Sequence, residues 1–147
     1  MPAGPFSGLL VVDLTRVLAG PFCTMILSEL GARVIKVENP DGGDDTRQFV
    51  PLWEGKSAYY LSLNRGKESI ALNLKEPRDR EVLLALIRTA DVVVENFRPG
   101  KLDHLGLGYE VLIRENPRLI FASVSGFGQT GPMSRKPAYD LMVDRKS

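Results

Sequence analysis

Residues 9–37 read LLVVDLTRVLAGPFCTMILSELGARVIKV, and this stretch determines the class of fold. Residues 9–14 form a short apolar run with two valines, which is typical of a buried strand. The pair Gly20-Pro21 then opens a helix, because proline suits a first helical turn, and Gly31 is a natural C-terminal stop. Residues 33–37 return to a strand pattern. The stretch therefore predicts a strand–helix–strand unit of a parallel α/β fold.

The rest of the chain continues to alternate between strand and helix patterns. Apolar strand patterns cover residues 69–74, 92–94 and 119–124. Helix patterns cover residues 77–90 and 109–115. Residues 39–45 are predicted to be a polar surface loop, and residues 100–108 an irregular connection. This order predicts an α/β fold with a Rossmann-like, doubly wound, mainly parallel sheet.

The last residues bear on how much of that fold is present. Residues 138–143 have the pattern of a helix start, and four polar residues then follow without a cap or a further strand. We therefore expect residues 1–147 to be the incomplete, N-terminal part of a larger domain. Apolar faces of the sheet and helices would then be exposed, which predicts poor solubility or dependence on a partner.

Composition restricts the class of protein. The chain has 147 residues, 44% of them hydrophobic and 25% charged, which is typical of one soluble globular domain. Its 19 basic and 18 acidic residues leave a net charge of +1, so no global field favours nucleic acid or an anionic membrane. The N-terminus lacks a signal-peptide pattern, and no span of about 20 apolar residues occurs, which predicts a cytoplasmic protein.

One cysteine and one histidine limit the possible covalent and metal chemistry. Cys23 excludes an internal disulfide and lies in an apolar run, so we expect a buried structural thiol. With only one residue of each kind, a conventional zinc site is not expected, and we assign no other metal. His104 lies among polar neighbours and is interpreted as a solvated surface side chain, with a ligand contact as the alternative.

The sequence contains one match to the dinucleotide-binding motif, but the residues around it do not fit that motif. The segment from Gly126 to Gly131 matches G-x-G-x-x-G after a strand pattern, but Pro132 and further loop residues follow it instead of a helix. The match also lies at the last strand of the unit and not at the first. We therefore interpret it as a flexible loop and not as an NAD or FAD site. The Walker A and G-x-S-x-G patterns are absent from the sequence.

Cationic side chains follow several of the expected strands. Lys75 ends one strand pattern, and Arg98 and Lys101 flank a Pro-Gly turn just after another. Ligands of an open parallel sheet bind outside the carboxyl ends of its strands, so these cations could hold phosphates. Ordinary solvated charge is the alternative for each of them, as it is for Arg65 and Lys67.

The pair Asn96-Phe97 is more specific, because it comes directly off the buried strand at residues 92–94. Asparagine supplies an amide that both donates and accepts hydrogen bonds, and phenylalanine supplies an aromatic face beside the cations. This combination suits an adenine ring that carries phosphates.

Several stretches together resemble one known family. They are VDLTRVLAGP at 12–21, LGARVIKVE at 30–38, NRGKESI at 64–70, VENFRPG at 94–100, the glycine-rich loop at 126–132, and Ala-Tyr-Asp at 138–140. In this order they resemble the landmarks of the class III CoA transferases, the group typified by formyl-CoA transferase. The resemblance extends from about residue 8 to residue 143.

The resemblance implies a Rossmann-like domain that binds coenzyme A, in subunits that interlock as a homodimer. By position, it places the CoA contacts at Leu18, Ala19, Leu72, Asn73, Leu74, Lys75, Asn96, Phe97, Arg98, His104, Tyr139 and Asp140. The sequence departs from formyl-CoA transferase at four positions. Leu18 replaces a glutamine, Asn39 and His104 each replace an arginine, and Pro137 replaces a lysine. These departures bear on the acyl substrate and on the phosphate contacts.

The reaction that the resemblance implies is transfer of coenzyme A from an acyl-CoA to a carboxylic acid through an aspartyl-CoA intermediate. The nucleophilic aspartate of the family is expected beyond Ser147, so no catalytic residue is assigned within the chain.

Other functions stay open. The family also contains the α-methylacyl-CoA racemases, which use a histidine at the position of Tyr139. A phenol with a pKa near 10 is a poor α-proton base at neutral pH, so tyrosine favours transfer over racemisation. The remaining alternatives are a non-catalytic CoA-binding or nucleotide-binding module, an enzyme completed by a second polypeptide, and an inactive fragment.

Overall fold

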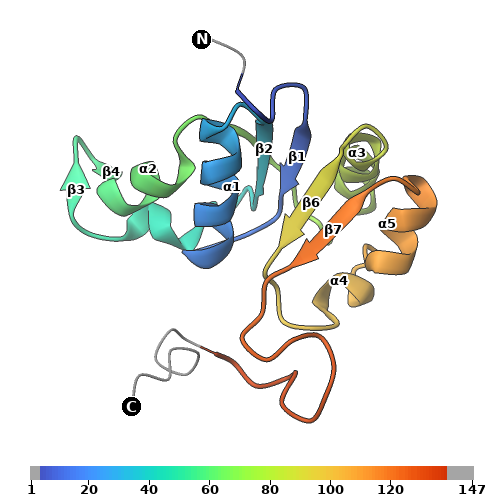
Figure 1. Cartoon of the computed structure of the whole chain (residues 1–147). Helices are drawn as coiled ribbons and strands as arrows, with labels where there is room; N and C mark the ends of the chain where they lie inside the picture. The colour runs from blue at the N-terminus through green and yellow to red at the C-terminus, as the bar shows by residue number, and fades with distance from the viewer. Residues whose placement is uncertain (1–3, 139–147) are drawn as a thin grey trace.

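A computed structural model describes residues 4–138 of the chain. Five strands form one sheet in the order β5-β2-β1-β6-β7, and every neighbouring pair is parallel (Figure 1). The strands are β1 (Leu10–Asp13), β2 (Arg33–Glu38), β5 (Glu68–Ala71), β6 (Val92–Glu95) and β7 (Ile120–Ser123). Counted along the chain, this is the 3-2-1-4-5 order of a Rossmann sheet, with its switch point between β1 and β6. The predicted fold class is confirmed.

The helices lie on both faces of this sheet. They are α1 (Ala19–Glu29), α2 (Ala58–Asn64), α3 (Pro77–Ile87), α4 (Lys101–His104) and α5 (Tyr109–Glu115). A 3-10 turn, η1 (Asp45–Gln48), and a small hairpin of β3 (Leu52–Trp53) and β4 (Lys56–Ser57) lie between β2 and α2. In Figure 1, α1 and α2 lie on one side of the sheet and α3 lies on the other. Among residues 4–138, no helix combines the length and apolar character needed to cross a membrane.

Alternate residues of the strands supply two apolar layers. Val12 and Val93 pack in a cluster that includes Leu83 of α3 and Leu112 of α5. Their neighbours in sequence, such as Val11, belong to a second cluster on the α1 side. Successive side chains of a strand point to opposite faces, so a sheet covered on both faces requires continuous apolar runs. The runs seen in the sequence follow from this double burial.

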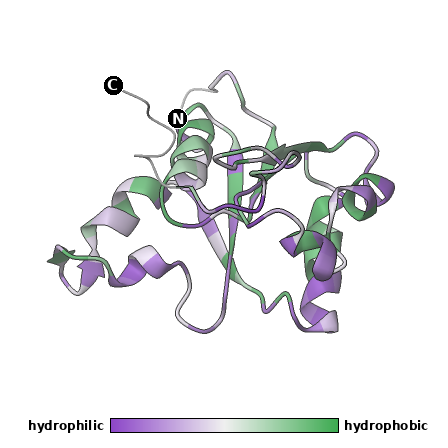
Figure 2. Ribbon diagram, turned by 90° about the horizontal axis from the view of Figure 1, so that it is seen from below, coloured by the Kyte–Doolittle hydropathy of each residue, from purple (hydrophilic) through white to green (hydrophobic). Residues whose placement is uncertain are grey.

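Some apolar side chains of the described region face solvent. On α1 these are Phe22 and Ile26, Leu30 follows the helix directly, and on the hairpin Trp53 is 65% exposed. Figure 2 shows hydrophobic colour on α1 and at the outer end of the hairpin. Cys23 is also exposed, so the prediction of a buried thiol is wrong. The helical period explains the error, because α1 turns Thr24 and Met25 toward the sheet and leaves Phe22, Cys23 and Ile26 facing outward.

Three further predictions need correction. Residues 100–108 are not entirely irregular, because they contain α4, which is too short for periodicity to reveal. The strand expected at 69–74 ends at Ala71, and Leu72 onward forms a turn. The loop at 39–45 does not lie wholly at the surface, because Asp44 is buried. The helix α2 was not predicted at all, although Ser57 caps it by accepting from the Tyr60 N–H.

Candidate functional site

A pocket of about 150 Å³ opens at the carboxyl edge of the sheet, and we call it the edge pocket. Its apolar lining comes from Leu14, Val37, Leu72, Leu74, Phe97 and Leu105. Three exposed cations, Arg16, Lys75 and Lys101, line the same pocket. They follow β1, β5 and β6 respectively. An apolar hollow with cations around it, at the carboxyl ends of parallel strands, is the expected place for a phosphate-bearing ligand.

Five of the predicted contact residues lie together in this pocket. They are Leu72, Asn73, Leu74, Lys75 and Phe97. The turn that carries the first four is fixed at its start by two hydrogen bonds. The Leu72 N–H donates to the Glu38 carbonyl at 2.8 Å, and the Asn73 N–H donates to the Asp79 carboxylate at 2.7 Å. Asp79 of α3 therefore holds this turn at the edge pocket.

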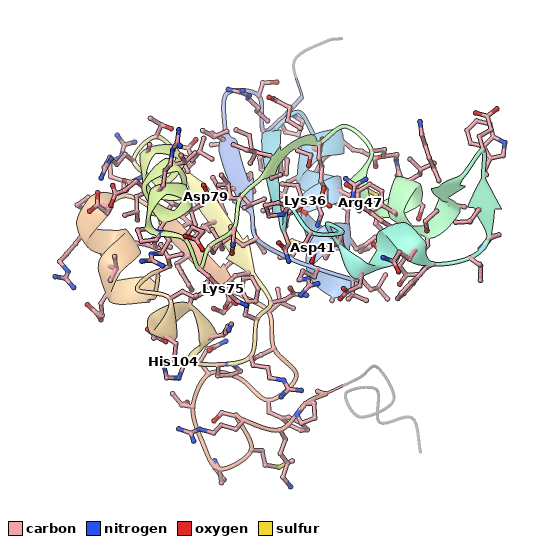
Figure 3. All side chains as sticks on the ribbon, turned by 180° about the vertical axis from the view of Figure 1, so that it is seen from behind. Lys36, Asp41, Arg47, Lys75, Asp79 and His104 are labelled. Carbon is pink, nitrogen blue, oxygen red and sulfur yellow. The ribbon has the colours of Figure 1, made fainter. Side chains whose placement is uncertain are left out.

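The other predicted contacts are distributed differently. Leu18 and Ala19 are exposed at the start of α1. Arg98 lines a second pocket, beside Glu95 and Tyr109. Figure 3 shows Lys75 beside the carboxyl edge of the sheet and His104 farther out on α4, where its side chain is exposed. Tyr139 and Asp140 lie outside the described residues.

The side chain of Asn96 joins two loops of the site. Its Oδ1 accepts from the Arg16 N–H at 2.9 Å, and its Nδ2 donates to the Arg16 carbonyl at 2.7 Å. Both functional atoms of the amide are thus bonded to the loop after β1. The sequence predicted an amide that both donates and accepts hydrogen bonds at this position. In the structure, the backbone of Arg16 bonds to both the oxygen and the nitrogen of this amide.

Asp13, at the end of β1, is a fully buried carboxylate with four donors around it. It accepts from the Thr15 N–H at 2.9 Å and the Thr15 hydroxyl, from the Thr24 hydroxyl at 2.6 Å, and from Lys67 Nζ at 3.0 Å. The side chain of Lys67 is only 1% exposed. Burial lowers the pKa of Lys67, and the charge of Asp13 opposes this shift. Lys67 is therefore a buried counter-ion, not the solvated charge that was its alternative interpretation.

A second buried carboxylate, Glu38, ends β2. It accepts from Arg47 Nε and Nη2, each at 2.7 Å, and from the Tyr60 and Ser69 hydroxyls, each at 2.8 Å. Burial raises the pKa of Glu38, but the hydrogen bonds from Arg47, Tyr60, Ser69 and the Asp44 N–H together lower it to about 2. This cluster ties η1 and α2 to the sheet, since Arg47 belongs to η1 and Tyr60 to α2.

The low pKa of Glu38 makes stability depend on pH. Its ordinary value is 4.5, so between about pH 4.5 and 2 the unfolded chain binds the proton and the folded chain does not. The ionised cluster should contribute about 3 kcal/mol above this window and lose it as the pH falls through it. Urea unfolding of the wild type and Glu38→Gln at pH 7 and pH 3 measures this difference.

The matched control for that experiment is Glu110→Gln, which removes an exposed carboxylate from α5. The Glu38→Gln penalty should be large at pH 7 and shrink toward pH 3, while Glu110→Gln should have little effect at either pH. A penalty for Glu38→Gln that stays the same at both pH values would contradict this assignment.

Sequence reasoning missed two features of the site. Arg16 lines the edge pocket and pairs with Asp45 at 2.8 Å, and its position directly after the first strand was the available signal. The buried pair of Lys36 and Asp44, 3.0 Å apart, gave no signal, because a lysine in a strand and an aspartate in a polar loop both suggest exposure. Within residues 4–138, no group of three or more His, Cys, Asp or Glu side chains is placed to hold a metal ion.

Comparisons with known proteins identify the family of the chain. The model of CoA-transferase family III matches residues 6–147. Acetyl-CoA:oxalate CoA-transferase of Acetobacter aceti is 59% identical over 146 residues, which cover 99% of this chain and 38% of that protein. Human succinyl-CoA:glutarate CoA-transferase is 51% identical over 144 residues, covering 97% and 33%. The chain thus spans about a third of the length of these curated relatives.

A solved structure has a similar fold. The crystal structure of a CAIB/BAIF family protein from Brucella suis superposes with a TM-score of 0.90 at 48% sequence identity. The match covers 95% of this chain and 38% of that one. The described fold is therefore similar to one part of a larger, experimentally known subunit.

Proposed function

Because the chain belongs to CoA-transferase family III, we propose that it supplies the coenzyme-A-binding part of an enzyme that moves coenzyme A from an acyl-CoA to a carboxylic acid. The observation that carries this proposal is the edge pocket, where an apolar lining and three exposed cations meet at the carboxyl ends of the strands. Coenzyme A requires both surfaces, since it joins an adenine ring to a diphosphate and a 3′-phosphate.

In the proposed complex, the adenine ring packs against Phe97 and Leu72, which are apolar and lie in the same pocket. Lys75, Lys101 and Arg16 donate charge-assisted hydrogen bonds to the phosphates. The other predicted CoA contacts among the described residues remain part of the proposal. They are Leu18, Ala19, Asn73, Leu74, Asn96, Arg98 and His104. The family model extends over Tyr139 and Asp140, which are retained on the resemblance alone.

The proposed reaction uses an aspartate that is expected beyond residue 147. Its carboxylate attacks the thioester carbonyl of the acyl-CoA, which gives a mixed anhydride and releases the CoA thiolate. The thiolate then attacks the aspartyl carbonyl, which forms aspartyl-CoA and frees the donor acid. The acceptor carboxylate repeats these two steps in reverse, so that acyl-CoA of the acceptor leaves and the aspartate is regenerated. The part of the chain that the structure describes would hold the CoA during both exchanges.

For the assembly, we propose the interlocked homodimer that the resemblance implies. Exposed apolar side chains on α1 and on the hairpin, including Phe22 and Trp53, support a covered surface there. Light scattering on the protein would contradict this proposal if the mass were that of a monomer.

Titration calorimetry with CoA tests the binding proposal. The full chain should bind CoA, and Phe97→Ala should weaken the affinity roughly tenfold, because stacking of a base on an aromatic ring is worth about 1–3 kcal/mol. Ile120→Ala removes an exposed apolar side chain of β7 that lies outside the edge pocket and should change the affinity little. Absence of binding to a chain that circular dichroism shows to be folded, or equal effects of the two variants, would count against the proposal.

A further inference from the structure

The loop that joins β1 to α1 contains a strained residue. Val17 has a φ of +70°, in the left-handed region that a β-branched side chain rarely adopts. Among the described residues, the other non-glycine residue with positive φ is Glu54, which lies in the hairpin turn where this conformation is usual. The strain at Val17 has no such local cause, so contacts from elsewhere in the fold must maintain it.

Three side chains from distant segments hold the backbone of this loop. Lys36 Nζ donates to the Thr15 carbonyl at 2.8 Å. The Asn96 amide bonds both backbone groups of Arg16, as described above. The Val17 N–H lies 3.3 Å from each carboxylate oxygen of Asp44. Three consecutive residues are therefore clamped from two sides.

Asp44 is the centre of one side of this clamp. It is 2% exposed, pairs with Lys36 Nζ at 3.0 Å, and accepts from the Thr46 N–H at 3.0 Å and the Thr46 hydroxyl at 2.8 Å. Burial raises the pKa of Asp44, but the Thr46 N–H and Lys36 outweigh this effect and lower it, so the carboxylate is ionised at neutral pH. A buried ion pair adds little net stability compared with an apolar pair of similar volume. The effect of this pair is therefore expected in the geometry of the loop that it fixes.

We propose that Asp44 is a positioning residue that, with Lys36 as its counter-ion, holds Val17 in the left-handed conformation and thereby keeps Arg16 at the wall of the edge pocket for CoA. Without the carboxylate, Val17 relaxes to negative φ, and the backbone carries Arg16 and Leu18 away from their present positions. The role in CoA binding rests on the proposed function, whereas the role in loop geometry does not.

A double-mutant cycle on the full chain tests the inference, with Asp44→Ala, Val17→Gly and the combination of both. Two measurements are made: amide hydrogen exchange of residues 15–18 and the affinity for CoA. Asp44→Ala should accelerate exchange in this loop and weaken CoA binding about tenfold. Glycine adopts positive φ without steric cost, so Val17→Gly in the Asp44→Ala background should restore most of the CoA affinity and most of the protection of the Arg16 N–H, which donates to Asn96. The amide of residue 17 should stay fast in both variants, because its acceptor was Asp44. A general loss of stability would not be repaired in this way.

Asp41→Ala is the matched control, since it removes an exposed aspartate from the same loop and should change neither measurement. If Asp44→Ala does not fold, Asp44→Asn replaces it, with a smaller effect in the same direction. Equal exchange for the Asp44 and Asp41 variants, or no recovery with Val17→Gly, would overturn the inference. If Asp44→Ala accelerates exchange and Val17→Gly reverses this, the role of Asp44 in loop geometry is supported even when the chain does not bind CoA. Lack of CoA binding would then refute only the proposed function.

Discussion

Replacing Lys67 with methionine should destabilise the chain by about 3–5 kcal/mol, which is the usual cost of leaving one partner of a buried ion pair without its counter-ion. Asp13 is fully buried, and Lys67 Nζ is the one cationic group among its hydrogen-bond donors in residues 4–138. Methionine keeps the length of the side chain but removes the charge. The midpoint of urea unfolding, with an unchanged slope, measures the loss.

Arg65→Met is the matched control for this prediction. Arg65 lies two residues away and also pairs with a carboxylate, that of Glu29, but these side chains are 52% and 47% exposed. Exposed pairs contribute about 0–1 kcal/mol, so the same substitution should cost little here. Lys67 does not line the edge pocket, and molecules of Lys67→Met that remain folded should bind CoA as the wild type does. Similar destabilisation by the two variants would show that Lys67 is not a structural counter-ion.

This contrast also shows what the sequence can and cannot predict. Arg65 and Lys67 flank the same glycine, and both were open to the interpretation of solvated charge. The structure separates them, because Lys67 extends beneath α1 to Asp13 and also donates to the Pro21 carbonyl at 2.9 Å. Apolar periodicity is a local signal, whereas burial of a charge depends on contacts such as this one between residues 54 positions apart.

The site was predictable to the extent that it follows from the topology of the sheet. Lys75, Phe97 and Lys101 were singled out because each follows a strand, and the edge of a parallel sheet brings such residues together. The four-residue helix α4 and the clamp on Val17 were not predictable in this way. The clamp depends on side chains from distant segments, and α4 is a single turn without a side-chain cap, so neither leaves a local pattern in the sequence.

The double charge reversal Lys75→Glu/Lys101→Glu should weaken CoA binding roughly 100-fold or more. Each lysine is exposed and lines the edge pocket, one after β5 and the other at the start of α4. A hydrogen bond to a charged group is worth about 1.5–3 kcal/mol, so losing two of them accounts for about 3–6 kcal/mol, and the new carboxylates repel the phosphates in addition. Titration calorimetry at low and moderate salt measures the change, because screening should reduce the repulsion.

The control for this reversal must carry the same change in net charge away from the pocket. Arg114→Glu/Arg118→Glu meets this condition, since both residues are exposed and lie outside the edge pocket, one on α5 and one before β7. Because surface substitutions of this kind alter stability by only about 0.5 kcal/mol, all four charge changes should leave the fold intact. A loss of affinity confined to the pocket variant would mean that local cation–phosphate contacts bind CoA. An equal loss in both variants would mean that only the overall field of the protein attracts the ligand, and the edge pocket would then no longer be the proposed binding site.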